Sequence, residues 1–67
     1  MEIATFVRQQ RKHYKLTQRD LAERAGVGIR FVRELEGGKT TLRLDKVTVV
    51  LQFFGGKLTV TQENLEA

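Results

Sequence analysis

Residues 16–36 constrain the fold more than any other part of the chain, because they place two short helical segments on either side of a turn that contains Gly26. Each segment is only about two turns long, so neither has a long face to bury against the other. We therefore expect the two helices to cross steeply, as in a helix-turn-helix pair. A steep crossing leaves the second helix free to stand out from the body and enter a groove about 12 Å wide.

Local signals define where these two helices begin and end. Thr17 and Asp20 have the spacing of a capping box at the start of the first helix, and Gly26 fits the left-handed position that closes it. Gly28 starts the second helix, and the Gly-Gly pair at 37–38 ends it.

Two further helices flank this pair. Apolar residues recur at helical spacing between residues 2 and 14, and again between about residues 44 and 54. The second of these stripes comprises Leu44, Val47, Val50, Leu51 and Phe54. Packing of both stripes against the central pair predicts an all-α bundle of about four helices.

Residues 57–61, KLTVT, are the only segment with the alternating pattern of a strand. A lone strand leaves its backbone groups unpaired, so we expect it to pair with the same strand of a second chain through Leu58 and Val60. A frayed tail is the alternative. Val49 and Phe53 fall outside the apolar stripe of the last helix and are predicted to belong to the same homodimer surface.

A chain of 67 residues is too short for two cores, so residues 1–62 are interpreted as one domain and residues 63–67 as a disordered tail. Because there is no cysteine to form a disulfide, association with a second chain is the remaining source of extra burial. The lack of a long apolar run or a signal-peptide pattern predicts a cytoplasmic, nucleoid-associated protein with no membrane partner.

Positive charge is concentrated in one part of the sequence. Residues 8–46 include eleven basic and five acidic residues, a balance of +6, whereas the whole chain carries +4. A basic region of this kind is typical of a protein that meets phosphate, although an ordinary solvated surface gives a similar total.

The outward face of the second central helix carries the residues expected to read bases. Arg30 and Arg33 lie opposite its buried side, and arginine is the side chain best suited to bidentate contact with guanine. Glu34 lies beside them, where it either accepts a hydrogen bond from cytosine or orders a neighbouring arginine. Gly28 and Ile29 lie at the N-terminal rim of the same face.

Four other polar residues are expected to contact the phosphates on both sides of the major groove of duplex DNA. Gln18 and Arg19 lie at the start of the first central helix, whose positive end attracts anions. Lys39 follows the second central helix, and Arg43 precedes the last one. Contacts of this kind fix the register of a protein on duplex DNA without reading its sequence.

Four short blocks recur in a known family: TQ at 17–18, LA at 21–22, GV at 26–27 and EGGK at 36–39. In this combination, residues 3–55 resemble the phage repressor and Cro-like helix-turn-helix family, the XRE group. The resemblance implies a lambda-repressor-like bundle that represses transcription by binding an operator. It also implies an ion pair between Arg11 and Glu36, whose loss is expected to be strongly destabilising.

The end of the chain extends this resemblance. The last helix with its LQFF end, followed by KLTV at 57–60, is similar to HipB-type antitoxins, in which a C-terminal strand pairs across the dimer. This similarity implies a HipA-like kinase toxin as a second partner and the pseudo-palindromic operator of the protein's own operon as the DNA site. A stand-alone XRE-type regulator without a toxin is the alternative.

Enzyme activity is not expected, and neither is a cofactor or a metal ion. The tripeptide GKT at 38–40 resembles the end of a phosphate-binding P-loop, but Arg33 stands where that motif needs glycine. His13 has no cysteine, serine or second histidine with which to form a catalytic or metal-binding group.

A protein-interaction module is harder to exclude. The same helices would then present Phe31, Val49 and Phe53 to a partner. For Phe31, packing on the first helix, filling of the core and contact with a thymine methyl group all stay open.

Overall fold

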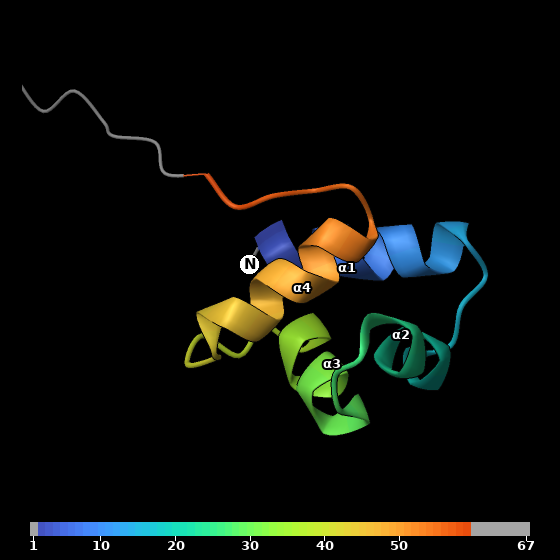
Figure 1. Cartoon of the computed structure of the whole chain (residues 1–67), viewed down its shortest axis with the longest axis horizontal. Coiled ribbons are helices and arrows are strands. Elements are labelled where there is room, and N and C mark those ends of the chain that lie inside the picture. Colours follow the sequence, from blue (N-terminus) through green and yellow to red (C-terminus); the bar gives the residue numbers. More distant parts are fainter. Residues whose placement is uncertain (1, 60–67) are drawn as a thin grey trace, which may run out of the picture.

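The computed structural model describes residues 2–59, which form four helices and no strand (Figure 1). The helices are α1 (Glu2–His13), α2 (Gln18–Ala25), α3 (Ile29–Glu36) and α4 (Leu44–Phe53). The expected helical bundle with a helix-turn-helix pair, formed by α2 and α3, is confirmed over this range. None of these helices is both long and apolar enough to cross a membrane.

Local signals set both ends of α2. Thr17 Oγ1 accepts a hydrogen bond from the Asp20 backbone N–H at 2.9 Å, and the Asp20 carboxylate accepts one from the Thr17 N–H at 2.9 Å. Gly26 has a left-handed φ of 77° and donates its N–H to the Ala22 carbonyl at 3.0 Å. The predicted capping box and glycine terminus are therefore confirmed.

The end of α1 departs from the sequence-based expectation. This helix stops at His13, one residue early, and the chain then turns through Lys15 with a left-handed φ of 58°. The Lys15 N–H donates to the Lys12 carbonyl and the Leu16 N–H to the Arg11 carbonyl, both at 3.0 Å. This is the hydrogen-bond pattern of a Schellman motif, in which glycine usually takes the left-handed position.

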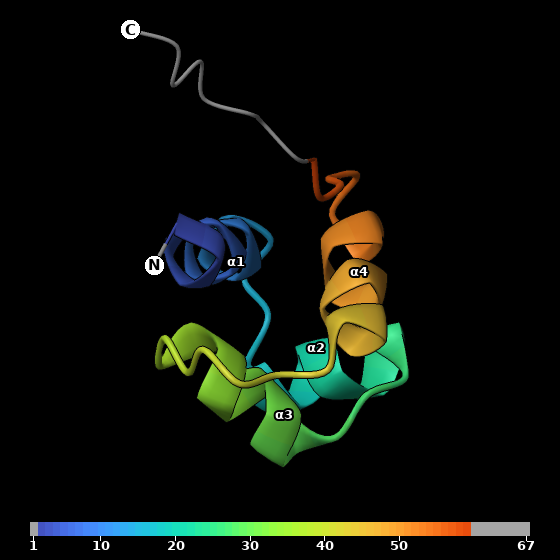
Figure 2. The same cartoon turned by 90° about the vertical axis from the view of Figure 1, so that its left-hand side faces the viewer.

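The core draws on all four helices. The fully buried side chains are Val7 of α1, Leu21 of α2, Val32 and Leu35 of α3, and Val50 of α4. In Figure 2, α1 and α4 lie above α2 and α3. The outward side of α3 thus faces away from the rest of the bundle.

The first residue of the apolar stripe on α4 is not buried in the core, although its spacing predicts that it is. Leu44 is 66% exposed, because it is the first residue of α4 and the first buried position follows at Val47. The helix also ends at Phe53 rather than at residue 54. Val49 and Phe53 are exposed, in agreement with the expectation that they point away from the core.

The predicted strand falls partly outside the described chain. Residues 57–59 are not in a strand and make no hydrogen bond within the described range. Val60, Thr61 and the tail at 63–67 lie outside the described residues. Strand pairing across a dimer therefore stays a prediction.

Candidate nucleic-acid interface

The outward face of α3 presents two exposed arginines. The Arg30 side chain is 91% exposed, and Arg33, three positions later on the same side of the helix, is also exposed. Gly28 precedes α3 as its N-cap rather than as its first residue, and Ile29 is half-buried against the core. Direct contact with a ligand at this face is therefore open mainly to the two arginines.

Glu34 contacts basic side chains on both sides. Its Oε2 lies 3.2 Å from Lys39 Nζ and 3.9 Å from Arg30 Nε. The carboxylate is half-buried beside these cations, which favours the ordering role over the direct acceptance of a base hydrogen bond. Lys39, expected to meet phosphate, shares this carboxylate in the free protein.

The position of α3 relative to α1 depends on its last residue. Arg11 donates from Nε to Glu36 Oε2 at 2.7 Å and from Nη2 to Glu36 Oε1 at 3.0 Å. The hydrogen bond and the charge of Glu36 raise the pKa of Arg11 above its ordinary value, against an opposing effect of burial. The structure thus brings together the two residues that the family resemblance pairs.

Three more contacts complete this junction. Gln18 Nε2 donates to Glu36 Oε1 at 3.3 Å, and Arg8 Nη2 donates to the Glu36 carbonyl at 2.8 Å. Arg11 Nη1 also donates to the carbonyl of Leu16, in the turn before α2, at 2.9 Å. The end of α3 and the turn before α2 are therefore tied to α1, and the start of α2 is tied to the end of α3, through side-chain hydrogen bonds.

The expected phosphate ligands lie on more than one side of α3. Arg19 is exposed at the start of α2, and Gln18 keeps one amide hydrogen that Glu36 does not accept. Arg43 is the N-cap of α4, and its Nη2 lies 2.8 Å from Asp45 Oδ2 while 70% of its side chain is exposed. A phosphate contact by Arg43 must compete with this exposed carboxylate.

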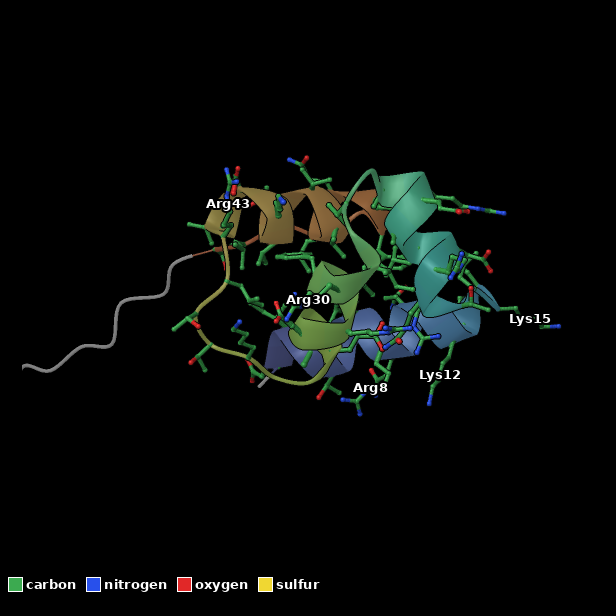
Figure 3. The ribbon with its side chains drawn as sticks, turned by 90° about the horizontal axis from the view of Figure 1, so that it is seen from below. Arg8, Lys12, Lys15, Arg30 and Arg43 are labelled. Carbon is green, nitrogen blue, oxygen red and sulfur yellow. The ribbon has the colours of Figure 1, made fainter. Side chains whose placement is uncertain are left out.

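A second set of cations lies on α1 and in the turn after it, and was not included in the expected site. In Figure 3, Arg8, Lys12 and Lys15 lie along one side of the view, with Arg30 over α3 at the centre and Arg43 on the other side. The sequence signal for this set was the spacing i, i+4 of Arg8 and Lys12, which places them on one helix face, with Lys15 just after the helix. The sequence alone did not indicate that this face lies beside α3.

Phe31 is half-buried and packs against the core cluster, as expected for side packing beside the outward face of α3.

Comparison with known proteins places this geometry in a family. A family profile described as helix-turn-helix, HTH_3, matches residues 7–60. The chain is also similar to a protein of Sinorhizobium fredii named "uncharacterized HTH-type transcriptional regulator y4mF". The two are 48% identical over 54 residues, which cover 81% of this chain and 71% of that protein. This chain therefore belongs to the XRE-type helix-turn-helix family, HTH_3.

Proposed function

We propose that this protein is a sequence-specific, double-stranded-DNA-binding transcriptional repressor that inserts α3 into the major groove. The observation that carries the proposal is the pair of exposed arginines, Arg30 and Arg33, on the outward face of a helix anchored through Glu36. Arginine at this position suits bidentate contact with guanine O6 and N7. The name of the Sinorhizobium relative, a transcriptional regulator, agrees with this role. The proposal involves no catalytic step.

Phosphate contacts from Gln18, Arg19, Lys39 and Arg43 are proposed to hold the protein on the duplex. Lys39 and Arg43 each have one acidic partner in the free protein, so binding exchanges a carboxylate for a phosphate. Because such exchange is electrostatic, affinity must fall steeply as salt rises.

A homodimer is proposed as the form that represses. Val49 and Phe53 are 41% and 40% exposed, and Leu58 is 36% exposed at the end of the described chain. A symmetric dimer binds a pseudo-palindrome whose half-sites lie about 34 to 36 Å apart. Two copies of α3 then enter successive major grooves on one side of the duplex.

The finer proposal is that the protein is the HipB-like antitoxin of a toxin-antitoxin operon and represses its own operator. The similarity of its last helix and the following KLTV segment to HipB-type antitoxins supports it. Affinity purification from the native host tests it, because a HipA-like kinase must then co-purify. Purification without a kinase leads instead to the stand-alone regulator.

Footprinting of the purified protein on a genomic library at low ionic strength tests DNA binding itself. A repressor protects defined sequences, and its protection is lost steeply as salt rises. A protein-interaction module instead protects no duplex, and its apolar contacts respond little to salt. The absence of any protected duplex at low salt contradicts the proposal.

A further inference from the structure

Arg8 and Lys12 of α1, with Lys15 in the turn that follows it, form an exposed basic stripe. Arg8 and Lys12 are four residues apart on one face of α1, Lys15 lies in the turn that follows the helix, and all three are exposed. We call these three residues the α1 stripe. Figure 3 shows it on one side of α3, with Arg43 on the opposite side.

The α1 stripe lacks acidic partners within residues 2–59. The ion pairs in this range join Arg11, Arg30, Lys39 and Arg43 to carboxylates, and none involves a stripe residue. Like charges four residues apart on a helix, as at Arg8 and Lys12, destabilise it by a few tenths of a kcal/mol per pair. The stripe therefore keeps repulsion within α1 that a bound anion relieves.

The backbone conformation of Lys15 is an independent indication that the charge of this side chain serves to bind an anion. Lys15 has a left-handed φ of 58°, a conformation that disfavours side chains with a Cβ. The other left-handed residues in the described chain are the glycines Gly26, Gly38 and Gly55. Attraction of cations to a helix C-terminus accounts in part for Lys12, but it does not require a lysine at the strained position.

One contact fixes the stripe next to the reading helix. Arg8 Nη2 donates to the carbonyl of Glu36, the last residue of α3, at 2.8 Å. The α1 stripe thus begins where α3 ends. A helix in a major groove is flanked by two phosphate backbones, and α3 is flanked by Arg43 on one side and by the stripe on the other.

We propose that the α1 stripe binds the phosphate backbone of the same duplex whose major groove α3 enters, on the side opposite Arg43. This inference rests on the proposed function. It assigns to α1 a share of the DNA affinity that does not depend on base sequence.

The salt dependence of binding tests the stripe directly. The probe is a fluorescent random-sequence duplex titrated with the full chain at several salt concentrations. For K12Q/K15Q, the slope of log affinity against log salt is expected to become shallower by about 1.8 per bound chain, or about 3.6 for a dimer, since each phosphate contact contributes about 0.9. The fold loss in affinity is expected to be similar on a duplex selected from the genomic library.

A matched control removes the same charge elsewhere. Arg24 and Lys57 each line a hollow that includes no residue of α3, so R24Q/K57Q is expected to keep the slope of the unmodified protein apart from a small change common to both double variants. If K12Q/K15Q has the slope of this control, the stripe does not contact DNA and the inference is overturned. If the unmodified protein shows no salt-dependent binding to duplex, the proposed function fails instead.

The variant Lys15→Gly is expected to change DNA binding and thermal stability in opposite directions. Glycine relieves the left-handed strain, so the thermal unfolding midpoint is expected to rise. At the same time, the salt slope is expected to become shallower by about 0.9 per bound chain. A more stable variant with an unchanged slope, combined with an unchanged slope for K12Q/K15Q, overturns the inference.

Discussion

Arg11 of α1 and Glu36 of α3 are joined by two hydrogen bonds. Arg11 donates from Nε to Glu36 Oε2 at 2.7 Å and from Nη2 to Glu36 Oε1 at 3.0 Å. Their side chains are only 13% and 4% exposed, so water screens the pair weakly. Arg11 lies near the end of α1 and Glu36 ends α3. The pair therefore forms a buried charged contact between α1 and the end of α3, in addition to the packing of α3 in the core.

Replacing Arg11 by Met is expected to lower the free energy of unfolding by about 3 to 5 kcal/mol, because Glu36 is left charged and buried. Glu36→Met is expected to cost less, about 1 to 3 kcal/mol. Arg11 is nearer to solvent than Glu36 and keeps its hydrogen bond to the Leu16 carbonyl at 2.9 Å. Urea denaturation followed by circular dichroism measures both changes.

A double-mutant cycle provides the control for this prediction. R11M/E36M removes both charges and is expected to be more stable than Arg11→Met alone. Arg43→Met, which breaks an exposed pair with Asp45, is expected to cost less than about 1 kcal/mol. Additive losses in the cycle contradict the coupling.

Local signals made the helix-turn-helix predictable. The capping box of Thr17 and Asp20 and the left-handed Gly26 depend only on neighbouring residues, and both are present in the structure. Leu44 was wrongly assigned to the core because helical spacing does not reveal how far a neighbouring helix reaches. The left-handed Lys15 was missed because its residue type gives no sign of that conformation.

The candidate site was predictable to a similar degree. A helical wheel places Arg30 and Arg33 on the outward side of α3, and both are exposed. Their contact with bases stays a prediction. The position of the α1 stripe beside α3 depends on packing between helices distant in sequence, so spacing within α1 did not indicate it.

The capping box predicts a specific dependence of stability on pH. The Thr17 backbone N–H, and then its side chain, hold the pKa of Asp20 below its ordinary value of 3.8. Because the pKa of Asp20 is lower in the folded state, the ionised carboxylate stabilises the fold above about pH 3.8. This stabilisation is lost as the pH falls through the pKa of Asp20 in the folded state. Asp20→Ala is therefore expected to be less stable than the unmodified protein near neutral pH, with a difference that narrows in acid.

Urea unfolding of both proteins across this pH range measures the difference. Glu23→Ala is the matched control, because it removes an exposed carboxylate of the same helix that has no capping role. Its curve is expected to run parallel to that of the unmodified protein. A difference for Asp20→Ala that is constant with pH contradicts the assigned role of the carboxylate.

The dimer proposal predicts that substitutions on the two faces of the segment 57–61 act differently. The double variant L58E/V60E places charge on the apolar face of the predicted strand, so it is expected to sediment as a monomer. The double variant T59E/T61E changes the other face and is expected to leave the dimer intact. Equal behaviour of the two variants in sedimentation velocity means that an alternating strand does not join the chains.

Base reading by α3 predicts that Arg33 controls specificity more than affinity. Arg33→Ala is expected to weaken binding to a duplex selected from the genomic library by about 1 to 3 kcal/mol and to change binding to random duplex little. Arg33→Lys keeps the charge but loses the planar fork, so it is expected to keep the salt slope and still lose discrimination. Competition between selected and random duplexes in fluorescence anisotropy measures both quantities. An equal loss on the two duplexes identifies Arg33 as a phosphate ligand, and recognition then depends on Arg30 or on the shape of the DNA.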